Sequence, residues 1–176
     1  MKYSNITVGK NAPHEVNAII EISMNSGPIK YEFDKDTEAL VVDRFMNTSM
    51  QYPCNYGFIP HTLSGDGDPA DILVYTSYPI LPKSVISVRP IGVLLTEDEK
   101  GQDEKILAVP GHKIDPYFSK IENYTDLPEV LLQKIEHFFK RYKDLENGKW
   151  VNVNGWKDAQ HACKVVQIAI DNYKNT

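Results

Sequence analysis

The stretch 71–95, DILVYTSYPILPKSVISVRPIGVLL, decides the fold class of this 176-residue chain. It is rich in β-branched and aromatic residues, which predicts strands at 71–77 and 85–95. Pro79, Pro82 and Pro90 divide the region, and Pro110 ends the next apolar run, so the strands are short and leave no room for crossover helices. This pattern favours a compact, mainly β barrel over a parallel sheet.

Outward from this stretch, four more segments alternate apolar and polar residues or are rich in Val and Ile: 17–23, 29–34, 39–45 and 105–110. The last third predicts two helices. Leu131, Ile135, Phe138, Tyr142 and Leu145 form the first apolar stripe. Asp126 and Glu129 match a capping box beside Pro128, and a short strand is expected at 148–153. The second helix follows Gly155, with a stripe at Ala159, Ala162, Val166, Ala169 and Tyr173.

Composition narrows the classes of function. A formal net charge of −5 argues against a nucleic-acid or anionic-membrane surface, and no apolar run reaches membrane-spanning length. Cys54 and Cys163 lie far apart, which is typical of a reducing compartment, so we expect a cytoplasmic protein. No linker-like segment divides residues 1–176, so we expect one domain.

The segment SGDGDPADIL, residues 64–73, places Asp66, Asp68 and Asp71 within six positions. Such carboxylates repel one another unless water solvates them in a turn or cations neutralise them. An EF-hand fails because Asp71 stands at the glycine position and Ser77 at the glutamate position of that loop. Residues 65–70, GDGDPA, also match GxGxxA, the pattern of dinucleotide-binding loops. The match is spurious, because it contains a proline and leads into a strand, where a dinucleotide-binding loop must lead into a helix.

A second acidic segment, 96–105, repeats the five-residue offset with Asp98 and Asp103. Alone it is typical of a charged hairpin loop, but hard oxygen donors from two loops suit Mg²⁺ or Mn²⁺. Lys30 and Glu32 share one face of a predicted strand, and Arg44 lies on another. Taken singly, each of these two strands has an ordinary polar face that points to solvent. If a barrel brings them together, carboxylates with Lys and Arg indicate phosphoryl chemistry.

Four longer stretches closely resemble the soluble inorganic pyrophosphatase family in its bacterial form. They are PIKYEFDKDT (28–37), ALVVDRFMNTSMQYPCNYGFIPHTLSGDGDPADILV (39–74), RPIGVLLTEDEKGQDEKILAVP (89–110) and HFFKRYKDLENGKWVNVNGW (137–156). The resemblance implies a closed five-stranded OB-like barrel with two flanking C-terminal helices. It also implies Mg²⁺-dependent hydrolysis of pyrophosphate to two orthophosphates, by in-line attack of a metal-activated water.

Residue by residue, the resemblance makes Asp68 the catalytic base. It assigns the metals to Asp66, Asp71, Asp98 and Asp103, with Glu32 and Glu21 in the acidic surround. It assigns phosphate binding to Lys30, Arg44, Tyr56, Lys105, Tyr142 and Lys143. The substrate is expected to enter as its Mg²⁺ complex, Mn²⁺ to substitute, Ca²⁺ to inhibit, and the chain to form a homohexamer. Ala70 stands where the family has a larger aliphatic residue, which concerns local packing.

Two other classes of function stay open on the sequence. A broader phosphohydrolase acting on nucleotides would need an aromatic platform for the base, which Tyr56 and Tyr142 could supply. A metal- or anion-binding module without catalysis would not need the full set of base, metal ligands and cations.

Overall fold

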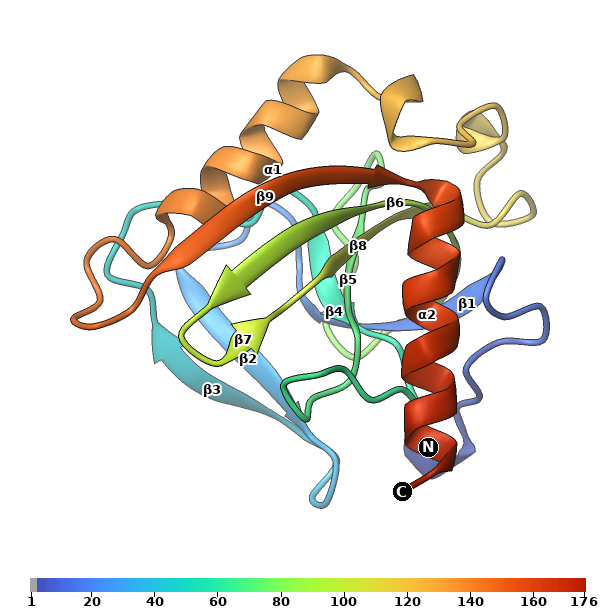
Figure 1. Ribbon diagram of the computed structural model, residues 1–176, viewed down its shortest axis with the longest axis horizontal. Helices are drawn as coiled ribbons and strands as arrows, with labels where there is room; N and C mark the ends of the chain where they lie inside the picture. The colour runs from blue at the N-terminus through green and yellow to red at the C-terminus, as the bar shows by residue number, and fades with distance from the viewer. Residues whose placement is uncertain (1–2) are drawn as a thin grey trace.

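The computed structural model describes residues 3–176. Five strands close into a ring of hydrogen bonds in the order β1 (Val16–Ile22), β4 (Asn55–Phe58), β5 (Asp71–Val74), β8 (Lys105–Pro110) and β6 (Val85–Asp98), and β6 pairs back with β1 (Figure 1). The pairs are antiparallel except β5 with β8, which is parallel. The predicted five-stranded barrel is confirmed.

The remaining strands extend the ring or stand apart from it. Strands β7 (Gly101–Gln102) and β9 (Val151–Asp158) pair with β6, and β9 is longer than the strand expected at 148–153. Strands β2 (Ile29–Asp34) and β3 (Ala39–Phe45) pair only with each other among the described residues. Figure 1 shows this hairpin at the lower left, to one side of the ring.

Two helices flank the barrel, as predicted: α1 (Glu129–Arg141) and α2 (Ala159–Lys174). Three 3₁₀ turns accompany them: η1 (Tyr3–Asn5), η2 (Pro116–Phe118) and η3 (Tyr124–Asp126). The buried positions of α1 are Leu131, Ile135, Phe138 and Phe139, and those of α2 are Ala162, Val166, Ala169 and Ile170. The two stripes were therefore correct at their centres and wrong at their ends, since Leu145 is 63% and Tyr173 41% exposed.

The predicted capping box on α1 is wrong. Pro128 is the N-cap of α1, and no side chain caps the helix. Asp126 instead accepts hydrogen bonds from the backbone amides of Glu122 and Asn123, both at 2.9 Å, and so closes a capping box on η3. The carboxylate bonds backward along the chain because η3 offers free amides before α1 begins.

The apolar residues form two clusters on opposite faces of the sheet. Leu73, Leu94 and Leu107 join the cluster that contains the α1 stripe, whereas their neighbours Ile72, Val93 and Ile106 join the cluster with the α2 stripe. Successive strand residues point to opposite faces, so continuous apolar strands bury both faces at once. Ala70, 1% exposed, belongs to the α2 cluster. No helix within residues 3–176 combines the length and apolar character needed to cross a bilayer.

Gly57 lies where β4 crosses closest to β1. A Cβ on Gly57 would meet the Ile19 carbonyl oxygen at 1.9 Å, which is a backbone atom that cannot move aside alone. We therefore expect Gly57→Ala to lower the free energy of unfolding by about 1–3 kcal/mol or more in urea titrations. Gly27→Ala is the matched control, because a Cβ on Gly27 would meet nothing within 4 Å. Equal stability of the two variants would contradict the close approach.

Candidate active site

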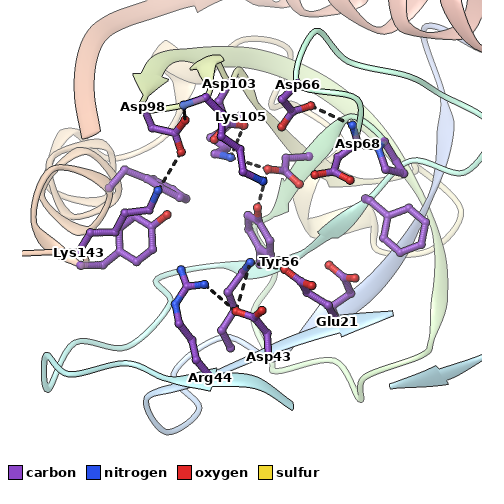
Figure 2. A pocket seen from close by; sticks show the side chains of 18 of the residues that line it. Glu21, Asp43, Arg44, Tyr56, Asp66, Asp68, Asp98, Asp103, Lys105 and Lys143 are labelled. Atoms are coloured by element: carbon purple, nitrogen blue, oxygen red, sulfur yellow. Dashed lines mark hydrogen bonds and ion pairs between the residues drawn. The ribbon is translucent and has the colours of Figure 1, made fainter. Parts of the chain in front are cut away.

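A cavity of about 390 Å³ lies where the ring, the β2–β3 hairpin and the C-terminal end of α1 meet (Figure 2). It contains every side chain that the sequence singled out for chemistry. These are Glu21, Lys30, Glu32, Arg44, Tyr56, Asp66, Asp68, Asp71, Asp98, Asp103, Lys105, Tyr142 and Lys143. The fold thus brings together residues spread over more than a hundred positions, while their individual roles stay predictions.

The aspartate loop is ordered by its own polar groups. The Asp66 carboxylate accepts a hydrogen bond from the Asp68 backbone amide at 3.1 Å, and the Ser64 amide donates to the Asp68 carbonyl at 2.7 Å. Gly67 between the two aspartates has φ +89°, a conformation that residues with a Cβ rarely adopt. The Asp68 carboxylate is exposed and makes no hydrogen bond or ion pair within residues 3–176. The loop therefore holds Asp68 through its backbone and leaves the carboxylate open to the cavity.

Lys105 occupies the centre of the cavity. The parallel pairing of β5 and β8 places Asp71 beside Lys105, and the buried ammonium group contacts the carboxylates of Asp71 and Asp103, the latter at 2.5 Å. The Tyr56 hydroxyl also donates to Asp71, at 2.5 Å. Burial alone would lower the pKa of Lys105, but the two carboxylates raise it above its ordinary value. Lys105 is therefore a permanent cation.

The end of α1 brings a second cation. Lys143, just beyond the helix, donates to the Asp98 carboxylate at 2.8 Å and lies 3.6 Å from Glu99. Burial works to raise the pKa of Asp98, but Lys143 and the Lys100 amide hold it below its ordinary value. Tyr142 stacks on Phe138 with ring centroids 5.0 Å apart, and burial raises its pKa, so it stays a protonated donor.

The β2–β3 hairpin supplies the third group. Lys30 and Arg44 are cross-strand partners, and both approach Asp43, with Lys30 Nζ at 3.7 Å and Arg44 Nη1 at 2.6 Å from its carboxylate. Arg44 Nε also contacts Glu146 at 3.3 Å. Lys30 contacts Glu32 on its own strand. Figure 2 shows Arg44 and Asp43 across the cavity from Asp66, Asp68 and Asp98.

Glu21 enters the cavity from β1. Its carboxylate accepts a hydrogen bond from the Phe33 amide at 2.7 Å. Burial raises the pKa of Glu21 to about 8, opposed by that amide and reinforced by Asp71. Burial also raises the pKa of Asp103, which Lys105 lowers and Asp71 raises further. Carboxylates that are crowded together in this way favour neutralisation by protons or cations.

The similarity to known proteins extends over nearly the whole chain. The family model described as inorganic pyrophosphatase matches residues 18–174. The chain belongs to the inorganic pyrophosphatase family. The inorganic pyrophosphatase of Agrobacterium fabrum is 55% identical over 174 residues, covering 99% of this chain and 98% of the relative. That of Rickettsia conorii is 59% identical over 158 residues, covering 90% and 91%.

Solved pyrophosphatases share the fold as well as the sequence. The crystal structure of inorganic pyrophosphatase from Thermus thermophilus has a TM-score of 0.93 and 44% identity, covering 99% of both chains. The inorganic pyrophosphatase from Helicobacter pylori has a TM-score of 0.92 and 46% identity, covering 97% of this chain and 99% of that one. The barrel with its two flanking helices is thus the pyrophosphatase fold.

The oxygen donors of this pyrophosphatase cavity fit a hard divalent cation. Asp71 and Asp103 already converge on one positive charge, the Lys105 ammonium group, and further carboxylates line the same wall. As the side chains lie, however, no group of three His, Cys, Asp or Glu residues within 3–176 is close enough to hold a metal ion. The donor chemistry therefore fits a divalent cation, although Asp71, Asp98 and Asp103 are paired with lysines as the side chains lie.

Sequence reasoning missed several charged residues of this pyrophosphatase cavity. Asp43, Glu99 and Lys149 also line it, and Lys149 contacts Glu99 at 2.6 Å. Asp43 precedes Arg44, so regular strand alternation would place the two side chains on opposite faces. The register between β2 and β3 is irregular at Lys30 and Tyr31 and skips Asp43, and this irregularity lets both side chains reach the cavity. Glu99 follows the end of β6, where alternation no longer applies. Asp43 and Glu99 could have been found only by asking which charged side chains form ion pairs with the predicted ones, and that depends on the folded structure.

The Tyr56 hydroxyl provides a test of this geometry. Burial and the neighbouring Asp71 raise the Tyr56 pKa well above its ordinary value, so the hydroxyl stays a donor to a charged carboxylate. We expect Tyr56→Phe to lower the free energy of unfolding by about 1–2 kcal/mol in urea with EDTA. Tyr52→Phe is the control, since the Tyr52 hydroxyl makes no hydrogen bond within residues 3–176 and should cost less than about 0.5 kcal/mol. Equal losses would argue against the contact between Tyr56 and Asp71.

Proposed function

We propose that this chain hydrolyses inorganic pyrophosphate to two orthophosphates in this cavity, and that the reaction requires Mg²⁺. The observation that carries the proposal is that all thirteen expected residues line one cavity, in a chain that belongs to the inorganic pyrophosphatase family. The cavity volume of about 390 Å³ suits a small ligand rather than a macromolecule.

Asp66, Asp71, Asp98 and Asp103 would hold Mg²⁺, with Glu21 and Glu32 adding negative charge around them. When bound, the cation would offset the charge of carboxylates and phosphates and lower the pKa of a water molecule. Mn²⁺, which prefers similar ligands, is expected to substitute. Pyrophosphate is expected to enter as its Mg²⁺ complex, because the free anion would be repelled by these carboxylates.

Asp68 is the proposed general base. Its exposed carboxylate, without a partner in the described chain, can accept a proton from the attacking water, and the ordered loop holds it in place. The water attacks one phosphorus atom in line with the bridging oxygen. A new phosphorus–oxygen bond forms as the bridging bond breaks, and the second phosphate leaves with the electron pair.

The phosphates would be held by Lys30, Arg44, Tyr56, Lys105, Tyr142 and Lys143. The lysines and Arg44 supply positive charge where negative charge accumulates on the leaving phosphate. Tyr56 and Tyr142 supply neutral hydroxyl donors, because their raised pKa values keep them protonated. Arg44 can bind two phosphate oxygens at once, which a lysine cannot.

The resemblance also leads us to propose a homohexamer in the cytoplasm. The two cysteines are free, Cys54 buried and Cys163 partly exposed, as a reducing compartment permits. Light scattering on the purified chain would test the assembly, and a mass other than six chains would reject it.

Phosphate release from pyrophosphate and from ATP, measured with Mg²⁺, Mn²⁺, Ca²⁺ or EDTA, tests the function. We expect hydrolysis of pyrophosphate with Mg²⁺ and Mn²⁺ and none with EDTA. Ca²⁺ should inhibit, because its oxygen ligands lie at about 2.3–2.6 Å rather than 2.0–2.1 Å and displace the water. A preference for ATP would favour the broader phosphohydrolase, and no release from either substrate would favour a binding module.

Two substitutions in the aspartate loop separate the base from a metal ligand. Asp71→Asn should weaken Mg²⁺ binding, and higher Mg²⁺ should restore part of the activity. Asp68→Asn should leave Mg²⁺ binding nearly normal but lower kcat by about 10²–10⁴-fold, since an amide cannot accept the proton. Extra Mg²⁺ should not restore it, whereas raising the pH should do so partly, as more water ionises unaided.

Calorimetric Mg²⁺ titrations beside kcat measured over a range of pH decide between the two roles. If Asp68→Asn loses Mg²⁺ affinity as severely as Asp71→Asn, then Asp68 is a ligand and the assignment of the base is wrong.

A further inference from the structure

The β2–β3 hairpin carries two of the proposed phosphate-binding residues but is not part of the ring. Its strands pair only with each other in the described chain, so no backbone ladder fixes the hairpin against the barrel (Figure 1). Lys30 and Arg44 sit at the base of the hairpin, at the register pair next to its open end. Their position relative to Lys105 and Asp71 therefore depends on side-chain contacts, namely the contact of Arg44 with Glu146 at the base of the hairpin and others farther along it.

Two turns near the hairpin tip contain non-glycine residues in the left-handed region. Glu38, in the turn between β2 and β3, has φ +56°, and Lys83, in the turn before β6, has φ +70°. This conformation is disfavoured for any residue with a Cβ other than Asn and Asp, and glycine is the usual occupant. Such a conformation persists only where surrounding contacts hold it, so the contacts of these two residues are informative.

The Lys83 side chain joins the two turns, and the Glu38 side chain ties the hairpin turn to the N-terminal segment. Lys83 Nζ donates to the Glu38 carbonyl oxygen at 2.6 Å, and the Glu38 carboxylate accepts from the Tyr3 backbone amide at 2.6 Å. The Lys83 backbone amide donates to the Ile20 carbonyl of β1 at 2.7 Å. A continuous set of bonds thus runs from the ring, through Lys83, to the tip of the hairpin.

The same contacts reach the wall of the cavity. Lys83 Nζ lies 5.6 Å from the centre of the Phe33 ring, and Tyr3 packs on Phe33 and Phe58 with centroids 5.6 and 5.9 Å apart. Phe33 and Phe58 both line the cavity, and the Phe33 amide holds the Glu21 carboxylate. Movement of the hairpin tip would therefore disturb the cavity as well as the outer surface.

We propose that Glu38 and Lys83 form a latch that holds the β2–β3 hairpin against the ring and so positions Lys30 and Arg44 toward the substrate. Lys83 is a positioning residue: it touches none of the proposed reacting groups and acts through the hairpin. The effect on catalysis rests on the proposed function, whereas the effect on the hairpin does not.

Lys83→Gly tests the latch, because glycine accepts the φ of +70° without strain and removes the side-chain donor to Glu38. Hydrogen exchange followed by mass spectrometry should show the amides of residues 31–42 exchanging about 5-fold to 10-fold faster than in the parent chain. The amides of β5 and β8 serve as the internal control and should not change. Lys83→Arg keeps a donor on a long side chain and should restore the slow exchange.

Steady-state kinetics with pyrophosphate provide the second test of the latch. Lys30 and Arg44 are proposed both to hold the substrate and to offset charge on the leaving phosphate, so loosening them should lower kcat/KM for pyrophosphate by about 3-fold to 10-fold, whereas Lys83→Arg should keep it near the parent value. Unchanged exchange in Lys83→Gly overturns the latch, and faster exchange with unchanged kcat/KM overturns its positioning role. If the parent chain proves not to hydrolyse pyrophosphate, the proposed function fails, and the exchange measurement still decides whether the latch exists.

Discussion

Lys105 is only 4% exposed, and a charge in that position is tolerated because Asp71 and Asp103 pair with it. The pairing follows from the one parallel contact in the ring, which sets Asp71 of β5 beside Lys105 of β8. Asp103 comes from the segment that leads into β8, two residues before Lys105, so the ammonium group and one of its partners are close in sequence. A shift of this register by one residue would bury Lys105 in the apolar core without a partner. The position of the cavity is thus fixed by the barrel itself.

Closure of the ring also explains why the two sides of the cavity differ in the residues that line them. The pairing of β6 with β1 completes the ring and leaves β2 and β3 outside it. The ring contributes most of the carboxylates, whereas the hairpin and the end of α1 contribute Lys30, Arg44, Tyr142 and Lys143. The ion pair of Arg44 with Glu146 links the hairpin to the segment after α1, and the ion pair of Lys143 with Asp98 links that segment to β6 of the ring.

Sequence patterns predicted the parts of this arrangement that depend on local periodicity. The strands at 29–34, 39–45 and 105–110 have the predicted bounds, because alternation or a continuous apolar run marks them clearly. Strand β4 was missed because Asn55 and Gly57 are both unfavourable in strands. It forms because it pairs with β1 and β5, and because only glycine permits the close approach to Ile19. Alternation placed Lys30 beside Glu32, but the pairing of Lys105 with Asp71 depends on strand register and that of Lys143 with Asp98 on helix packing, neither of which spacing predicts.

The two sides of the cavity also differ in rigidity, in a way that matches the chemistry proposed for each. Beside Asp68, the Ala70 amide donates to Thr62 Oγ1 at 2.9 Å and the Thr62 hydroxyl to the Ile59 carbonyl at 2.6 Å, so the loop is tied to the core at both ends. A base must lie within about 0.5 Å of its productive position, which requires such support. Within the described chain, the hairpin has no strand ladder to the barrel and is held by the packing of Tyr31 and Phe33 and by polar contacts such as that of the Phe33 amide with Glu21. A group that binds phosphate through charge tolerates more movement, since Coulomb attraction falls off gradually with distance. The loop that carries the proposed base is therefore anchored to the core by hydrogen bonds, as a step that depends steeply on geometry requires.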